Sequence, residues 1–337
     1  MPTNHPAAEL RIAVLGVGQM GGYHVDTLSA RTKGARVTVV SDYSHERATE
    51  VASAVGARVV DDPLEAVRAD DVDAVVIASP GAFHEAQVLA CLEAGKPVLC
   101  EKPLTIEAGT AYDVVLTEAK LDRPLVQVGF MRRFDAEYLA LRETIATGEL
   151  GNALVLHCAH RNPAVPDHFD STMMLTDSVV HEVDSARFLL DEEIVAVRVL
   201  AGLATSAAPS GTSDPMIVVF ETESGRLVTD EIFVRTTHAY EVRTELVAER
   251  GTAMIGLGHA LQTSSGGRWG GQVTPDFVAR FGQAYADELQ AWVDGARRGE
   301  VGGPGAWDGY AAAAVTEAAV EALRTGGRVE VDLQPRP

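Results

Sequence analysis

The chain has 337 residues, of which 46% are hydrophobic and 23% charged, a balance that is ordinary for a globular enzyme. This composition excludes a disordered or fibrous protein, and the length is sufficient for two domains. Lys and Arg number 28 against 48 Asp and Glu, so the formal charge of -20 would repel nucleic acid and anionic membrane surfaces.

Short β-branched runs alternate with helical segments in the first part of the chain. The expected strands are LRIAVLG, RVTVVSD, ARVV, VDAVVIAS, KPVLCEK and PLVQVGF, with helices between most of them. This alternation is typical of a parallel sheet wrapped by crossover helices. We therefore expect an α/β Rossmann domain with a doubly wound parallel sheet over residues 10–128.

The first expected strand leads into a glycine-rich turn, GVGQMG at residues 16–21, directly before a helix. In such a turn the first glycine permits a tight bend, the second lets the backbone approach a pyrophosphate, and the third lets the helix pack closely on the strand. The amides and dipole at the helix N-terminus also favour phosphate. We expect cofactor contacts from Gly16, Gly18, Gln19, Met20 and Gly21.

The second expected strand ends at Asp42. A carboxylate in this place can accept hydrogen bonds from the adenosine ribose and would repel a 2'-phosphate, which favours NAD over NADP. The nearby Arg47 leaves residual use of NADP open. The alternative is that Asp42 only forms a turn.

Polar residues also follow the fourth and fifth expected strands. Ligands of doubly wound sheets bind at the carboxyl ends of the strands, so these residues should lie on the cofactor side. They are Ser79, Pro80, His84, Glu101 and Lys102.

After Phe130 the helices become rare, and we expect a second, α+β domain over residues 129–334 with an open, mostly antiparallel sheet. Its strands are ALVLHCAHR, EIVAVRVLAG, MIVVFE, RLVTDEIFVR and YEVRTELVAE, with TESG as a hairpin turn. Residues 256–271 read as a Gly- and Ser-rich loop, and helices are expected at 276–298 and 304–326, the last closed by Gly326-Gly327.

One expected helix carries polar groups on a single stripe. Asp177, His181 and Asp184 are spaced i, i+4 and i+7, so they point together on a helical period. The stripe is either a solvated face, with Thr176 or Asp177 as N-cap, or part of a functional site.

Cysteine usage indicates the compartment. Cys91, Cys100 and Cys158 are an odd number of widely spaced residues, which suits reduced thiols in the cytoplasm. The first ten residues resemble no signal peptide, and no apolar run approaches a membrane span. We expect a cytoplasmic protein with no membrane or nucleic-acid partner.

Several motifs occur in a fixed order: the glycine turn, Asp42, EKP at 101–103, GFMRRFD at 129–135, HRNP at 160–163 and DSVVHEVD at 177–184. In this order they resemble the glucose-fructose oxidoreductase and inositol dehydrogenase family. AYEVRTELV, QAYADE and GPGAWDGY extend the similarity over nearly the whole chain. The resemblance implies the two-domain fold described above and a homotetramer assembled through the outer sheet faces.

The resemblance further implies NAD as cofactor, and a cyclitol such as myo-inositol as the small-molecule substrate, oxidised at a ring hydroxyl to the ketone. It assigns Lys102, Asp177 and His181 to the catalytic group. Around the substrate it places Met131, Arg132, His160, Asn162, Asp184, Tyr240 and Tyr285. The segment STMMLT stands where many members have a glycine-rich run, and the resemblance does not fix the stereoisomer.

Oxidation of an alcohol by NAD requires a base for the hydroxyl proton. His181 suits this role because its ordinary pKa is near working pH, and Asp177 can orient the imidazole. Lys102 can stabilise negative charge on the oxygen or take the proton itself.

Two other interpretations compete with this one, and a zinc site is excluded. The substrate could be another polyol or an aldose, or the protein could be a non-catalytic NAD sensor, which would need neither a base nor a polar pocket. A zinc site in HEVD lacks the second histidine of H-E-x-x-H, because Ser185 occupies that place.

Overall fold

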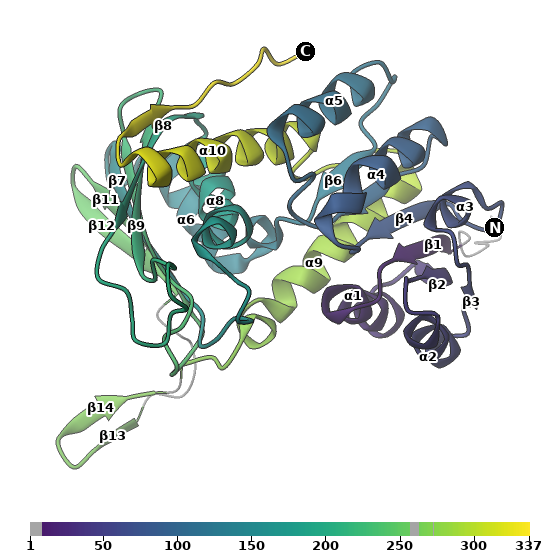
Figure 1. Ribbon diagram of the computed structural model, residues 1–337, viewed down its shortest axis with the longest axis horizontal. Coiled ribbons are helices and arrows are strands. Elements are labelled where there is room, and N and C mark those ends of the chain that lie inside the picture. The colour runs from purple at the N-terminus through teal and green to yellow at the C-terminus, as the bar shows by residue number, and fades with distance from the viewer. Residues whose placement is uncertain (1–8, 257–262, 272) are drawn as a thin grey trace, which may run out of the picture. The chain divides into compact units, whose positions relative to one another are not determined.

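The computed structural model describes residues 9–256, 263–271 and 273–337 (Figure 1). Contacts divide the chain into two units. The first unit contains the chain up to Phe130 with Tyr285–Ala313 and Gln334–Pro337, and the second contains Met131–Ala284 and Ala314–Leu333.

A six-stranded parallel sheet forms the centre of the first unit, in the order β3-β2-β1-β4-β5-β6. This is the strand order of a dinucleotide-binding fold, so the predicted doubly wound sheet is confirmed. Its strands are β1 (Leu10–Leu15), β2 (Ala35–Ser41), β3 (Arg58–Val59), β4 (Ala74–Ile77), β5 (Val98–Cys100) and β6 (Val126–Val128).

Helices connect these strands, as the alternating pattern predicts. They are α1 (Gln19–Ala30), α2 (His45–Val55), α3 (Pro63–Arg68), α4 (His84–Glu93) and α5 (Ala108–Glu118), with a short 3-10 turn η1 (Gly81–Phe83) before α4. Side chains of Ser44 and Asp62 cap α2 and α3 by accepting bonds from backbone amides.

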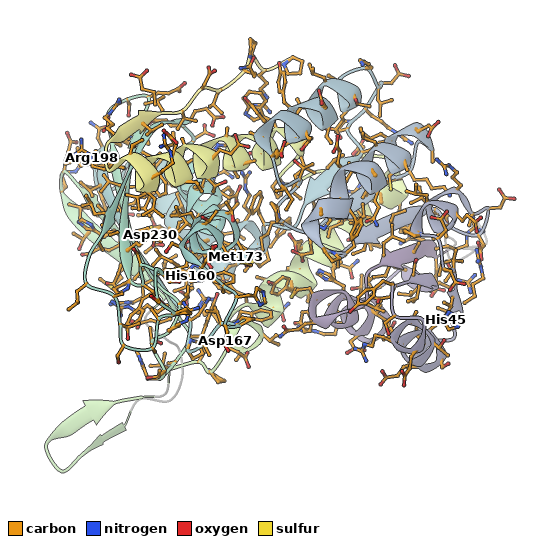
Figure 2. All side chains as sticks on the ribbon, viewed as in Figure 1. His45, His160, Asp167, Met173, Arg198 and Asp230 are labelled. Atoms are coloured by element: carbon orange, nitrogen blue, oxygen red, sulfur yellow. The ribbon has the colours of Figure 1, made fainter. Side chains whose placement is uncertain are left out.

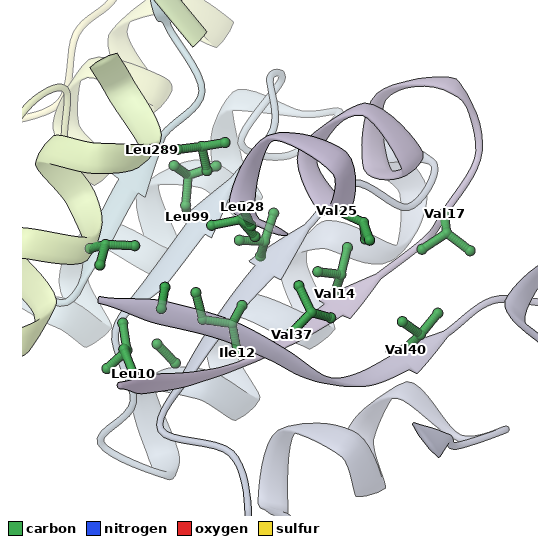
Figure 3. Close-up of a cluster of buried hydrophobic side chains, with 14 of the residues drawn as sticks. Leu10, Ile12, Val14, Val17, Val25, Leu28, Val37, Val40, Leu99 and Leu289 are labelled. Atoms are coloured by element: carbon green, nitrogen blue, oxygen red, sulfur yellow. The ribbon is translucent and has the colours of Figure 1, made fainter. Parts of the chain in front are cut away.

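The core of the first unit explains the run of consecutive apolar residues in β1. Ile12 and Val14 point into the cluster drawn in Figure 3, and Ala13 and Leu15, which point the other way, are equally buried. Both faces of the sheet are therefore covered, as in other parallel sheets.

Part of helix α9 (Phe277–Arg298) belongs to this core, because Leu289, Trp292 and Val293 pack in the same cluster. Residues 285–313 group with the first unit, and they lie within the range 129–334 that the sequence analysis expects for the second domain. The helical pattern itself indicated a helix but not the unit against which its apolar face packs.

The second unit contains a seven-stranded sheet in the order β12-β11-β7-β10-β9-β8-β15. All neighbouring strands in it are antiparallel except β7 and β10, so the expected mostly antiparallel sheet is confirmed. The strands are β7 (Ala153–Arg161), β8 (Ile194–Ala201), β9 (Met216–Thr222), β10 (Leu227–Phe233), β11 (Glu241–Ala248), β12 (Gly251–Ile255) and β15 (Arg328–Glu330).

The turn and loop predictions have mixed outcomes. The predicted hairpin between β9 and β10 is confirmed, with Gly225 donating to the carbonyl of Thr222. Within the predicted loop, the hairpin of β13 (Thr263–Ser265) and β14 (Arg268–Gly270) corrects the expectation, and residues 257–262 lie outside the described residues. Gly- and Ser-rich sequence is typical of loops but does not prevent a short antiparallel pairing.

The remaining helices are η2 (Met131–Phe134), α6 (Ala136–Thr147), α7 (Ser171–Met173), η3 (Met174–Val179), α8 (Val180–Leu190) and α10 (Ala306–Thr325). α9 and α10 follow the two predicted C-terminal helices closely, and Gly326, directly after α10, has a positive φ of 70°. No helix among the described residues is long and apolar enough to cross a membrane.

Candidate functional site

The glycine turn of the first unit has the geometry that a dinucleotide requires. Gly16 has a φ of 81°, and a Cβ there would lie 2.5 Å from the backbone nitrogen of Ser79. A Cβ on Gly21 would lie 1.8 Å from the carbonyl oxygen of Gly16. In contrast, a Cβ on Gly18 would meet nothing within 4 Å. The backbone therefore packs too closely for a side chain at Gly16 and Gly21, whereas the space beside Gly18 is open. A pyrophosphate would approach the turn at Gly18.

Asp42 lies directly after β2 and is tied to this turn. Its Oδ2 accepts a hydrogen bond of 2.7 Å from the amide of Val17, and Oδ1 accepts one of 2.8 Å from the amide of Ser44. Arg47 closes the same corner by donating from Nε to the carbonyl of Val17 at 3.1 Å and from Nη1 to Glu50 at 2.7 Å. Asp42 thus holds the glycine turn, and its half-buried carboxylate stays at the strand end expected for a ribose acceptor.

The residues after β4 and β5 are linked by His84. Its Nδ1 lies 2.7 Å from the carbonyl of Pro103, and its Nε2 lies 2.8 Å from the carbonyl of Ser79. Burial lowers the pKa of His84. Both ring nitrogens therefore face backbone oxygens, so His84 holds together the two segments that carry Ser79 and Lys102. Pro80 lies between Ser79 and the 3-10 turn η1.

Glu101 has a partner that the sequence did not suggest. Nε2 of the fully buried His24 lies 2.7 Å from Oε1 of Glu101, and Oε2 accepts a bond of 3.2 Å from the amide of Lys102. His24 comes from α1, which also carries Gln19 and Met20 in its first turn. The helix that begins at the glycine turn thereby fixes the residue before Lys102. A histidine inside an apolar helix face was the only available sequence signal.

Tyr285 belongs to the first unit, next to these residues. Its ring centroid lies 5.6 Å from that of Tyr23 and 6.1 Å from that of His24, in edge-on arrangements. The sequence expected Tyr285 near the substrate. Tyr285 therefore lies beside His24, the residue that contacts the Glu101 carboxylate.

In the second unit the stripe of Asp177, His181 and Asp184 lies on a continuous helical stretch. This stretch begins after Asp170, whose side chain caps the amide of Met173 at 2.8 Å, so neither Thr176 nor Asp177 is the N-cap. All residues of α8 are buried, which excludes a solvated face for that helix. η3, which contains Asp177, has π-helical geometry, a wider turn that is frequent at functional sites.

A cluster of buried polar side chains faces this helix from β7 and η2. Nη1 of Arg132 donates to Oε1 of Glu182, and Oε2 of Glu182 lies 3.0 Å from Nδ1 of His160. The ring of His160 lies 6.3 Å from that of His181 and 6.0 Å from that of Tyr240. The structure thus brings together four residues that the sequence singled out, and it adds Glu182.

Asp184 points to a different partner. Oδ1 of its nearly inaccessible carboxylate accepts bonds of 2.6 Å from Nη2 and 3.1 Å from Nε of Arg133. Asn162 uses its backbone, donating to Phe233 and accepting from Thr236, and its side chain is half-buried. Met131 is buried at the start of η2.

Burial and charge together set the titration of the buried cluster. Burial opposes ionisation of Glu182, but Arg132 and His160 outweigh this effect and lower its pKa. Burial raises the pKa of Tyr240 to about 12. Asp230, on β10, is fully buried, and burial together with the charge of Glu182 raises its pKa well above the usual range.

Comparison with known proteins adds the family. A model described as "Oxidoreductase family, NAD-binding Rossmann fold" matches residues 10–130, and one described as "Oxidoreductase family, C-terminal alpha/beta domain" matches residues 142–331. An inositol 2-dehydrogenase of Rhodococcus erythropolis is 58% identical over 335 residues, covering 97% of this chain and 97% of that protein. One of Rhodococcus jostii is 54% identical over 344 residues, covering 97% and 94%.

A solved structure has the same fold throughout. It is a myo-inositol dehydrogenase from Lactobacillus casei in complex with NAD(H) and myo-inositol, with a TM-score of 0.94 and 32% sequence identity, covering 98% of each chain. The residues matched by the NAD-binding model include the glycine turn and Asp42.

Proposed function

The chain belongs to the oxidoreductase family with an NAD-binding Rossmann fold, and from this premise we propose that it is an NAD-dependent inositol dehydrogenase. It oxidises myo-inositol, or a close cyclitol, at a ring secondary hydroxyl to the inosose. The observation that carries this proposal is the full-length similarity to inositol 2-dehydrogenases. A binding module that only senses NAD would not need the buried acid, base and guanidinium groups of the second unit.

The bound NAD would accept the hydride that leaves the carbinol carbon. The hydroxyl proton must leave with it, because a protonated ketone would otherwise form. In our proposal His181 takes this proton, and Asp177, one helical turn earlier, orients the imidazole and stabilises its charged form. Lys102 stabilises the oxygen as its negative charge develops. A variant of the scheme in which Lys102 takes the proton uses the same three residues.

The residues around the cyclitol are proposed from the family resemblance: Met131, Arg132, His160, Asn162, Asp184, Tyr240 and Tyr285. A polyol needs many donors and acceptors in its pocket. Support comes from the cluster in which the rings of His160, His181 and Tyr240 are neighbours. Asp184, bound to Arg133, would act on the substrate together with that arginine.

We also propose a cytoplasmic homotetramer. The three cysteines are free, buried thiols, and burial raises the pKa of each, which suits a reducing compartment. The sheet face opposite α8 carries partly exposed apolar side chains that a second copy would cover, namely Leu200, Ile217, Leu227 and Met254. Light scattering coupled to size exclusion would measure the mass of the assembly.

The experiment that tests the function is NADH formation, followed by absorbance, with myo-, scyllo- and chiro-inositol and with glucose. We expect the highest kcat/KM with one of the inositols. Faster turnover of glucose than of every inositol would replace the substrate with an aldose. Tight NAD binding without turnover of any polyol would support a sensor.

A further inference from the structure

Glu182 lies at the centre of a buried polar triad in the second unit, defined here as Arg132, His160 and Glu182. The three residues come from η2, β7 and α8, and each is at most 3% exposed. Each carboxylate oxygen of Glu182 has one partner: Oε1 accepts from Nη1 of Arg132, and Oε2 faces Nδ1 of His160 at 3.0 Å. The triad therefore shares one carboxylate between a guanidinium and an imidazole.

The hydrogens of the triad follow from the chemistry of its groups. A guanidinium only donates, and an ionised carboxylate only accepts. The contact of 3.0 Å between Oε2 and Nδ1 is therefore a hydrogen bond only if Nδ1 of His160 carries a proton. The longer contact of 3.4 Å from Nη2 of Arg132 to the same nitrogen is the weaker candidate. In a neutral ring the proton on Nδ1 leaves Nε2 with a lone pair.

Nε2 is the ring atom of His160 that remains available. Among the described residues it has no hydrogen-bond partner, while Nδ1 is engaged by the triad. The ring lies beside those of His181 and Tyr240. An acceptor in this place suits a ligand with hydroxyl donors.

Glu182 also provides the counter-charge for the buried guanidinium of Arg132. This guanidinium lies among aromatic rings, with its central carbon 6.0 Å from the ring centroid of Tyr138 and 5.7 Å from that of Phe281. A buried guanidinium without a counter-charge is strongly unfavourable, so Glu182 must be ionised to neutralise it.

A second buried carboxyl group nearby provides a contrast. Asp230, on β10, lies opposite Cys158 on β7. Because His160 follows Cys158 by two residues, the side chains of Asp230 and His160 lie on the same face of the sheet. Both residues are labelled in Figure 2. Neither carboxyl oxygen of Asp230 has a hydrogen-bond partner in the part of the chain that the structure describes. A carboxylate without donors would be unfavourable there, so Asp230 is a neutral acid outside the triad.

We propose that Glu182 is a positioning residue that holds His160 with its proton on Nδ1, so that Nε2 accepts a hydrogen bond from a hydroxyl group of the substrate. The identity of this ligand as a cyclitol rests on the proposed function. The tautomer of His160 does not, because it follows from the triad alone. Glu182 acts through His160 and has no contact with the substrate in this scheme.

The first test measures the tautomer in the wild-type protein. Long-range proton–nitrogen NMR spectra of the imidazole rings, recorded near neutral pH, distinguish the nitrogen that carries the proton. The His160 signals are assigned by their absence in His160→Gln, or by contacts with the Tyr240 ring if that variant does not fold. We expect a protonated Nδ1 and an unprotonated Nε2. The opposite tautomer would overturn the proposal, whether or not the protein oxidises inositol.

The second test compares two isosteric changes, Glu182→Gln and Asp230→Asn. In Glu182→Gln the amide oxygen is drawn to Arg132, so the amide nitrogen, a donor, faces Nδ1 and drives the proton to Nε2. We expect the tautomer to change and kcat/KM for the best inositol to fall about tenfold or more, as loss of a charged hydrogen bond predicts. The loss should be larger in KM than in kcat.

Asp230→Asn is the matched control, because it replaces a group that already carries no charge. We expect its His160 signals and its kcat/KM to stay within about twofold of the wild type. Equal losses in the two variants, or unchanged His160 signals in Glu182→Gln, would overturn the proposal. If the wild type has no activity with any cyclitol, the function fails while the tautomer measurements still decide the inference.

Discussion

Nε2 of His24 lies 2.7 Å from Oε1 of Glu101, and both side chains are buried in the first unit. This contact links α1 to the strand end that carries Lys102, whose amide donates to the other oxygen of Glu101. The helix that follows the glycine turn therefore supports both the predicted phosphate contacts and the predicted catalytic lysine.

Replacement of His24 by leucine should destabilise the protein. Leucine leaves the buried Glu101 without its partner, and we expect the free energy of unfolding to fall by about 1–3 kcal/mol. Urea denaturation measures the change. His45→Leu is the control, because His45 and Asp61 form a pair of similar length, 2.8 Å, that is exposed to solvent. Its effect should stay below about 0.5 kcal/mol, and equal effects of both changes would contradict the supporting role of His24.

Two alanine substitutions should separate the two functions of the glycine turn. Gly21→Ala places a Cβ 1.8 Å from the Gly16 carbonyl oxygen, so the strand and α1 must move apart and the protein should lose stability. Gly18→Ala meets no atom within 4 Å, so it should cost less stability than Gly21→Ala while NAD affinity falls. Thermal denaturation and NAD titration by fluorescence test this pair. Undiminished NAD affinity in Gly18→Ala would show that the cofactor does not approach there.

Removal of the Asp42 carboxylate should relax the choice of cofactor. Asp42→Ala removes the negative charge that would repel a 2'-phosphate, so the ratio of kcat/KM for NADP to that for NAD should rise by about tenfold or more. Asp42→Asn removes the charge but nearly keeps the shape of the side chain, because the amide oxygen can still accept a bond from the amide of Val17 or Ser44. An unchanged ratio in both variants would assign Asp42 to the turn alone.

Lys102→Ala and His181→Ala should each bind NAD with near-normal affinity and lose most turnover. Positioned acid-base catalysis typically contributes about 10² to 10⁴ in rate, so kcat with inositol should fall by about 10² or more. Stopped assays of NADH formation and NAD titration distinguish chemistry from binding. Lys120→Ala, an exposed lysine after α5, is the control. Near-normal kcat in either catalytic variant would remove that residue from the proposed mechanism.

Asp230 should make stability depend on pH. Burial, together with Glu182, raises the pKa of Asp230, so the native state keeps this proton to higher pH than the unfolded chain. The contribution of protonated Asp230 to stability is fully present below the pKa of the unfolded state, about 3.9. This contribution is lost as the pH rises through the pKa of the folded state. Asp230→Asn cannot ionise.

The free energy of unfolding of Asp230→Asn relative to the wild type should therefore increase with pH, by up to about 1.4 kcal/mol per pH unit. Urea denaturation at several pH values between about 5 and 8 measures the difference. A difference that is constant with pH would mean that Asp230 titrates normally.

Some features of the fold were readable from local sequence. The β-branched runs of the first unit, the glycine turn and Asp42 at the end of β2 all appear where expected. The missed features involve pairing between distant segments. β7 and β10 pair in parallel, but the periodicity of a strand indicates only which face is buried and not which strand lies next to it. β12 is a short edge strand with few apolar residues, so its sequence gives a weak signal.

The stripe on η3 and α8 shows the same division within the candidate site. Sequence placed Asp177 and His181 on one helical face but left a solvated face as an alternative, which the burial of α8 excludes. Their catalytic roles, and that of Lys102, stay predictions. Glu182, next to His181 in sequence, gave no signal of its own, because a glutamate in a helix is usually solvated.

By itself, the sequence determined the doubly wound sheet, the mostly antiparallel second sheet and the glycine turn, since strand periodicity and glycine sterics act over a few neighbouring residues. Only the tertiary structure decided that Glu182 binds Arg132 and His160, which lie 50 and 22 residues away, and that Asp230 has no such partner among the described residues. The reason is that the charge and proton of a buried polar group depend on the side chains that folding brings next to it.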